Sequence, residues 1–233
     1  MDSPVRGGNP AGAEKSRVKI EIQLPGVRIG VVEADGVTVA PSAAELVREM
    51  DDECARLRQR YTLESLADAE SIISVRAMFR NWGVDASKYR PSSEALLRRV
   101  IQGKGLYRVS NIVGLTNLSS VETGWPYGVY NRAQISPPVT LRPGAARERY
   151  EGIGRRVWHL TDRPVLADAN GPFGSPISDS TRTQIVDGVT EVLTVIYTPA
   201  GASDAALDSA AKKQAARLSA FAGAAGTRTC IIG

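Results

Sequence analysis

The chain has 233 residues, of which 42% are hydrophobic and 23% are charged, the composition of a globular protein with a sizeable core. Lys and Arg number 29 against 25 Asp and Glu, and this net charge of +4 is too small to indicate a nucleic-acid partner by itself. No apolar run reaches the roughly 18 residues of a membrane-spanning helix, and no secretory signal is visible. Cys54 and Cys230 lie far apart, so we expect two reduced thiols in a cytoplasmic protein without a membrane partner.

The N-terminal part of the sequence changes from an unpatterned stretch to strands. Residues 1–16 are rich in Gly and Pro and predict a disordered leader. Residues 18–39 alternate apolar and polar side chains, with breaks at residues 25–26 and 35–36. This pattern predicts short strands joined by a hairpin turn.

Three helices are predicted next. Ser42 and Glu45 have the spacing of a capping box, and Cys54 belongs to the apolar stripe that follows, where we expect it in the core. Residues 64–81 form the second predicted helix. Its inward positions are Leu66, Ile72, Ile73, Val75, Met78 and Phe79. The third helix covers residues 94–101, after Pro91 and Ser92.

Strand and turn patterns dominate the remainder. The predicted strands are residues 106–109, 111–117, 127–131, 138–142, 155–160, 164–168, 183–186, 191–199 and 227–233, with a helix at 204–221. We therefore expect an α+β fold, in which a central, mostly antiparallel or mixed sheet is flanked by helices. A single domain over residues 17–233 would contain a strand and helix lobe (17–88), a pocket-bearing core (89–200) and a C-terminal helix and strand (201–233).

Strong catalytic motifs are absent from the sequence. It contains neither a G-x-x-x-x-G-K-[ST] loop nor a G-x-S-x-G elbow. The single histidine, His159, lies in a predicted strand, where a structural role is favoured over catalysis. We expect neither a metal nor a cofactor.

Two short polar segments remain as candidate sites. Thr116 and Asn117, at the end of a predicted strand, offer a hydroxyl and an amide that bind a substrate without titrating, and residues 124–128 form a Gly-Trp-Pro-Tyr-Gly turn beside them. Residues 175–183 are the second candidate, with Ser178, Asp179, Arg182 and Thr183 as its polar groups. The structural alternatives are a hairpin with an Asn cap and a polar connecting loop.

Basic residues gather in two places. The first cluster is Arg98, Arg99, Lys104 and Arg108, and the second is Arg147, Arg149, Arg155 and Arg156. Each could be a solvated face, whereas two clusters beside a pocket favour a polyanion such as RNA.

Residues 89–131 contain YRPSSEALLRRV, GKGL, IVGLTN and GWPYGVYN in that order. This succession resembles the B-three/B-four domain of the phenylalanyl-tRNA synthetase beta subunit and its free-standing relatives, from about residue 76 to residue 197. In the synthetase, the domain is an editing site that hydrolyses tyrosine mis-attached to the tRNA for phenylalanine. The resemblance implies the same fold and an activity on aminoacyl-tRNA.

The resemblance also implies a set of site residues. Thr116 and Asn117 match the pair that faces the substrate, and Gly124 and Pro126 match the Gly-x-Pro turn. Gly128 replaces a histidine of the synthetase pocket, Asn131 replaces an aspartate, and no acid occupies residues 196–197. These differences argue against tyrosine editing of the synthetase kind, and the missing side chain at Gly128 leaves room for another amino acid.

Three functions follow as hypotheses. The first is a trans-acting aminoacyl-tRNA deacylase, in which Thr116 and Asn117 act in catalysis and the first basic cluster holds tRNA. The substrate contacts would be Gly124, Pro126, Gly128, Asn131, Ser178, Asp179, Arg182 and Thr183. The alternatives are a non-catalytic tRNA- or RNA-binding module and an aminoacyl-tRNA-dependent aminoacyl transferase.

Overall fold

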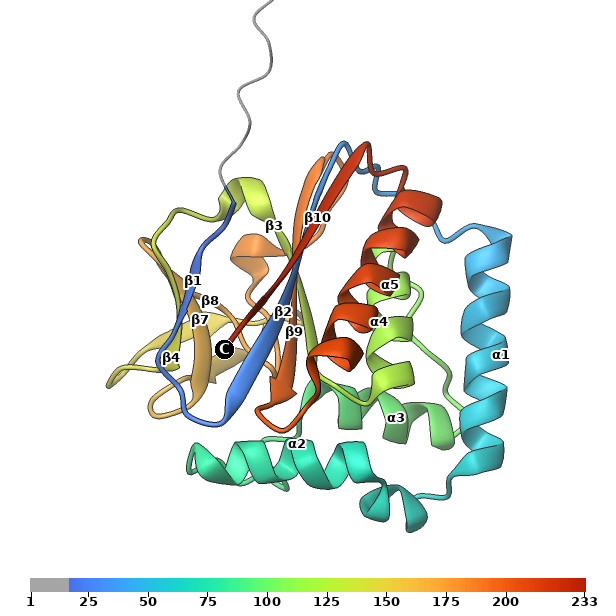
Figure 1. The fold of residues 1–233 in the computed structure, drawn as a ribbon, viewed down its shortest axis with the longest axis horizontal. Coiled ribbons are helices and arrows are strands. Elements are labelled where there is room, and N and C mark those ends of the chain that lie inside the picture. The colour runs from blue at the N-terminus through green and yellow to red at the C-terminus, as the bar shows by residue number, and fades with distance from the viewer. Residues whose placement is uncertain (1–16) are drawn as a thin grey trace, which may run out of the picture.

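The computed structural model describes residues 17–233, and the expected leader at residues 1–16 lies outside them. The described chain contains two four-stranded sheets, a two-stranded arm and five α-helices (Figure 1). The predicted α+β fold with mixed sheets is thereby confirmed.

The sheet in the middle of the molecule, which we call the central sheet, is antiparallel throughout. Its strands, in spatial order, are β10 (Gly226–Ile232), β2 (Val27–Asp35), β9 (Glu191–Pro199) and β3 (Tyr127–Asn131). β9 lies between β2 and β3, and its near-continuous run of apolar residues suits a strand that is buried on both faces.

The second sheet, called the outer sheet, combines parallel and antiparallel pairs. Its strands, in spatial order, are β1 (Ile20–Ile22), β4 (Val139–Pro143), β7 (Pro164–Asp168) and β8 (Gly171–Gly174). The hairpin predicted within residues 18–39 is wrong, because β1 pairs with β4 and β2 belongs to the other sheet. A two-stranded arm of β5 (Arg149–Glu151) and β6 (Val157–His159) extends from the outer-sheet side.

Helices pack on both faces of the central sheet and separate two cores. One face, which we call the helix face, is covered by α4 (Asn111–Thr123) and α5 (Asp204–Ala222), and α1 (Ala44–Arg60) and α3 (Ser92–Ile101) pack against α4 from the outside. The other face packs against the outer sheet and α2 (Glu70–Asn81). Because side chains alternate along a strand, Val192 and Ile196 of β9 enter the first core, and Leu193 and Val195 enter the second.

The largest correction concerns residues 111–117, which were predicted as a strand and form the first half of α4. Ser110 caps this helix by accepting a hydrogen bond from the backbone N–H of Val113. The side chain of Asn111 also bonds to the carbonyl oxygens of Thr38 and Phe221. α4 is buried on nearly all sides, so its apolar residues show no helical period and imitate a buried strand.

Smaller differences arise at other predicted elements. The segment 64–81 is divided into a 3-10 turn, η1 (Ser65–Asp68), and α2, and Ile73 is half exposed instead of inward. Residues 106–109 and 183–186 form no strand, since η3 (Thr181–Thr183) precedes an irregular segment. Ser42 does not cap α1, because Ala43 holds that position and the Ser42 hydroxyl is buried without a partner.

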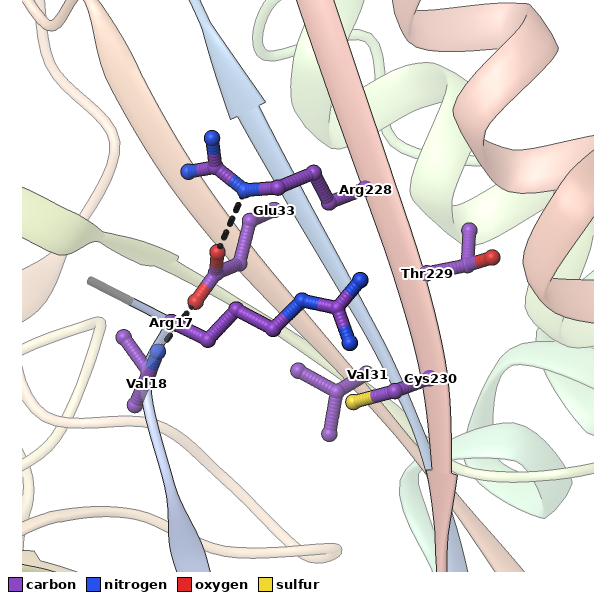
Figure 2. A pocket seen from close by; sticks show the side chains of 7 residues that line it. All are labelled: Arg17, Val18, Val31, Glu33, Arg228, Thr229 and Cys230. Atoms are coloured by element: carbon purple, nitrogen blue, oxygen red, sulfur yellow. Dashed lines mark hydrogen bonds and ion pairs between the residues drawn. The ribbon is translucent and has the colours of Figure 1, made fainter. Parts of the chain in front are cut away.

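The start of β1 is tied to the edge of the central sheet through Glu33. Its carboxylate accepts hydrogen bonds from the backbone N–H of Val18 and from Nε of Arg228 (Figure 2). Cys230 lies beside this contact, whereas Cys54 is buried on α1, and both thiols are free. Burial raises the pKa of each thiol, which fits the predicted structural role of Cys54. Within residues 17–233, no helix combines the length and the apolar character that crossing a bilayer requires.

Candidate functional site

Thr116 lies on α4 and faces α5 across the helix face of the central sheet. Its hydroxyl donates to the carbonyl of Ile112 at 2.8 Å and accepts from Nε2 of Gln214 at 3.0 Å. Gln214 also approaches the hydroxyl of Thr194 on β9, at 3.4 Å. Thr116 and Gln214 are both buried, so in this conformation the hydroxyl of Thr116 joins two helices and the sheet instead of facing solvent.

Asn117 has a different environment from its neighbour. It is half-buried, and its side-chain amide has no hydrogen-bond partner within the described part of the chain. The turn predicted after it is present: Gly124 ends α4 in the left-handed conformation, with φ of 73°. A side chain at Gly124 would also collide with Ser71 of α2. Trp125 and Pro126 then lead into β3.

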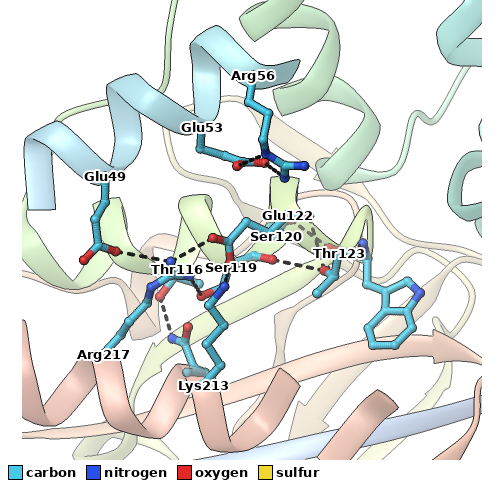
Figure 3. A network of polar contacts seen from close by, with 12 residues as sticks. Glu49, Glu53, Arg56, Thr116, Ser119, Ser120, Glu122, Thr123, Lys213 and Arg217 are labelled. Atoms are coloured by element: carbon cyan, nitrogen blue, oxygen red, sulfur yellow. Dashed lines mark hydrogen bonds and ion pairs between the residues drawn. The ribbon is translucent and has the colours of Figure 1, made fainter. Parts of the chain in front are cut away.

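An ionic network joins α1, α4 and α5 next to Thr116 (Figure 3). Arg217 donates to both carboxylate oxygens of Glu122, at 2.7 and 2.8 Å, and to the hydroxyl of Ser119 at 3.0 Å. Burial tends to raise the pKa of Glu122, but the hydrogen bonds and charges of Arg217 and Lys213 outweigh it and hold that pKa below its ordinary value.

Gly128 lies on the opposite face of the central sheet from Thr116. Tyr127 packs into the helix-face core, and its neighbour Gly128 therefore points toward the outer sheet, as Tyr130 does. A Cβ at Gly128 would collide with the ring and hydroxyl of Tyr130, and so would one at Gly174. The space expected at Gly128 is therefore filled by Tyr130, and the structure does not place Thr116 and Gly128 in one pocket.

Tyr130 belongs to a polar cluster that the sequence did not reveal. Its hydroxyl lies 2.8 Å from Oδ1 of Asp179 and 3.1 Å from the hydroxyl of Tyr197. Burial raises the pKa of Asp179 to about 7, although hydrogen bonds from Tyr130 and from the backbone N–H of Ser175 act in the opposite direction. Asp179 is therefore the one predicted site residue whose carboxyl group can exchange a proton near neutral pH.

The remaining predicted substrate contacts hold the loop at residues 175–183 and its surroundings in place. Arg182 donates to both oxygens of Asp168, at 3.2 and 2.9 Å, and Thr183 donates to the carbonyl of Phe173. The carbonyl of Ser178 accepts from the hydroxyl of Tyr150. Asn131 accepts from the backbone N–H of Ala133 and starts η2 (Arg132–Gln134).

Three of the four predicted RNA contacts line one hollow, which we call the basic hollow. It has a volume of about 350 Å³ and lies between α1 and the segment that connects α3 to α4. Its lining consists of Met50, Asp51, Arg99, Lys104, Gly105, Leu106, Tyr107 and Arg108. The guanidinium group of Arg99 lies 3.9 Å from the ring centre of Tyr107, which is 49% exposed. Arg98 is on the same helix but does not line the hollow, and Tyr107 was missed because one aromatic residue after two glycines carries no periodic signal.

Comparison with known proteins then decides the family. A family model described as the B3/4 domain matches residues 74–220, more than half of the chain. The chain belongs to the B3/4 domain family. This membership confirms the resemblance seen in the motifs of α3, α4 and β3.

One sequence relative and one solved structure similar to this B3/4 domain are both phenylalanyl-tRNA synthetase beta subunits. A phenylalanine–tRNA ligase beta subunit from Tropheryma whipplei (strain Twist) is 31% identical over 97 residues, which are 41% of this chain and 10% of that subunit. An N-terminal fragment of the beta subunit from Pyrococcus horikoshii superposes with a TM-score of 0.43 at 13% identity, covering 92% of this chain and 51% of the fragment. The chain thus spans about a tenth of its curated relative, and the family assignment rests on the family model.

Proposed function

We propose that this B3/4 domain binds tRNA and that the basic hollow is a contact for it. The observation that carries the proposal is the combination of cations and an exposed aromatic ring in one concave surface. Arg99 and Lys104 supply positive charge for phosphate, and the ring of Tyr107 offers a face on which an unpaired base can stack. Arg108 contributes less charge, because it forms an ion pair with Asp51 at 2.7 Å. The family relation to a tRNA synthetase subunit supports tRNA as the ligand.

The proposal is tested by charge removal at the hollow. The variant Arg99→Ala with Lys104→Ala should bind tRNA about tenfold or more weakly, and the slope of log affinity against log salt should fall by about two. Arg80→Ala with Lys19→Ala is the matched control, because both side chains are exposed and lie outside the hollow. Filter binding at several salt concentrations measures both quantities. The proposal would be contradicted if the two variants lost the same amount of tRNA affinity. It would also be contradicted if the unmodified protein did not bind tRNA.

Hydrolysis of aminoacyl-tRNA in trans is a second candidate function. The observation that favours it is Asn117, whose amide lies in the family motif without a hydrogen-bond partner in the described chain and is therefore free to bind a substrate. Thr116 would act beside it only after releasing Gln214, because its hydroxyl is already bonded there. An activated ester requires little more than a positioned water and a few polar groups.

This second function is tested with purified mischarged tRNAs. We expect release of at least one amino acid, and we expect Asn117→Ala to slow that release by about one to three orders of magnitude. Asn170→Ala is the control, since that exposed amide bonds to Ser136 far from α4 in the chain. If no ester is cleaved faster than in buffer, the domain binds tRNA without acting on it.

A further inference from the structure

The arm formed by β5 and β6 carries a second group of cations with few local partners. Arg147, Arg149, Arg155 and Arg156 are all exposed, and none of them forms an ion pair with a residue of the described chain. Most other arginines near the arm are neutralised: Arg142 binds Glu148, and Arg182 binds Asp168. The one aromatic contact of the group is Arg156, which lies 4.8 Å from the ring centre of Trp158. The arm therefore presents positive charges that are not neutralised by acidic residues of the described chain.

Beside these arginines lies a hollow of about 530 Å³, which we call the arm hollow. Its lining residues are Glu151, Gly154, Arg155, Thr181 and Gln184. The arm is fixed against the loop at residues 175–183, since the N–H of Ile153 donates to the carbonyl of Asp179 and the hydroxyl of Thr181 donates to the carbonyl of Glu151. The side-chain amide of Gln184 has no partner in the described chain, so the hollow offers free hydrogen-bonding groups next to a guanidinium.

We propose that the arm is an RNA-binding surface, in which the unpaired arginines hold backbone phosphates and the arm hollow receives a ribose. This inference rests on the proposed tRNA binding and adds a second contact on the other side of the central sheet, since the basic hollow lies by α1 and the arm lies by the outer sheet. A guanidinium group binds phosphate with two parallel hydrogen bonds, and Thr181 and Gln184 suit the hydroxyl groups of ribose.

A membrane surface is the competing ligand for an exposed cationic arm. Ile153 and Val157 are 56% and 53% exposed and could enter a bilayer. The arm hollow favours RNA, because its lining is polar and concave. An anionic bilayer is bound better by a projecting apolar edge that is surrounded by cations. RNA is therefore the ligand that accounts for both the arginines and the hollow.

The test compares two arm variants with a matched control. Arg155→Ala with Arg156→Ala should weaken tRNA binding about tenfold and lower the salt slope by about two, as expected for two lost phosphate contacts. Glu151→Gln should strengthen binding severalfold, because it removes the acidic group from the hollow, and a misfolded protein would not bind more tightly. Arg58→Ala with Arg80→Ala, two exposed arginines without ion pairs in the described chain, should change little.

The outcomes separate this inference from the proposed function. No tRNA binding by the unmodified protein would refute both. If the basic-hollow variant weakens binding and neither arm variant changes it, only the arm inference is overturned. If the arm variant instead loses binding to vesicles of phosphatidylserine and phosphatidylcholine while its tRNA affinity is unchanged, the arm is a membrane contact.

Discussion

Asp179 and Tyr130 show how single side chains determine the space inside this B3/4 domain. Tyr130 fills the space beside Gly128 and Gly174, so the loss of a side chain at Gly128 does not enlarge a pocket. The same hydroxyl holds the carboxyl group of Asp179 in a buried environment. A tyrosine and two glycines therefore form a closely packed site next to a buried, titratable acid.

The raised pKa of Asp179 makes stability depend on pH in a defined direction. Between its ordinary value of 3.8 and about 7, the folded protein holds a proton that the unfolded chain has released. The free energy of unfolding should therefore decrease as pH rises through this window, on the order of a few kcal/mol, because burial disfavours the charged carboxylate in the folded protein.

Asp179→Asn keeps the shape of the side chain and removes the titration. Urea unfolding at pH 5, 6, 7 and 8 should show a smaller decrease in the variant than in the unmodified protein, with the variant more stable at pH 8. If the free energy of unfolding changes with pH by the same amount in both proteins, another group causes the pH dependence.

At the scale of elements, α4 and α5 are joined by polar contacts rather than by apolar packing alone. Thr116 bonds to Gln214, and about one turn further along α5 Arg217 bonds to Ser119 and Glu122. This buried joint holds the family motif against the helix face of the central sheet. It also determines that Thr116 is a structural contact in this conformation.

Arg217→Met should destabilise the fold by about 3 kcal/mol, because Glu122 is left partly buried without its main partner. Lys213→Met is the control: Lys213 also binds Glu122, but its side chain is 55% exposed, so its loss should cost about 1 kcal/mol or less. Chemical unfolding at pH 7 measures both differences. Similar costs for the two variants would mean that the buried arginine contributes no more than the exposed lysine.

At the scale of the whole molecule, the central sheet separates two cores and two basic surfaces. The helix face carries the family motif, and the basic hollow opens beside α1. The opposite face carries Tyr130, Asp179 and the outer sheet, from which the arm extends. A ligand that reached both surfaces would have to be larger than a single nucleotide, and tRNA meets this condition.

Combining the basic-hollow and arm variants tests whether one tRNA contacts both surfaces. Because the two sites share no residues, we expect their losses in binding free energy to add and the salt slope to fall by about four in total. Filter binding of the fourfold variant Arg99→Ala, Lys104→Ala, Arg155→Ala and Arg156→Ala measures the sum. A combined loss no larger than that of either pair would indicate that tRNA uses only one of the two surfaces.

Local patterns in the chain were enough to predict several strands, two helices and the family of this protein. Short, evenly spaced segments between turn residues predicted β3, β7 and β9, apolar spacing predicted α1 and α5, and the order of short motifs predicted the family. Each of these signals lies within one element or within a short run of consecutive ones, where side-chain periodicity and capping residues are readable.

How these elements pack against one another could be learned only from the folded molecule. α4 was mistaken for a strand because a helix buried on nearly all sides loses its amphipathic period. The positions of Thr116 and Gly128 on opposite faces, and the meeting of Tyr130, Asp179 and Tyr197, depend on contacts between residues up to 98 positions apart. No local pattern encodes such contacts, since they arise only when the sheets and helices pack around a common core.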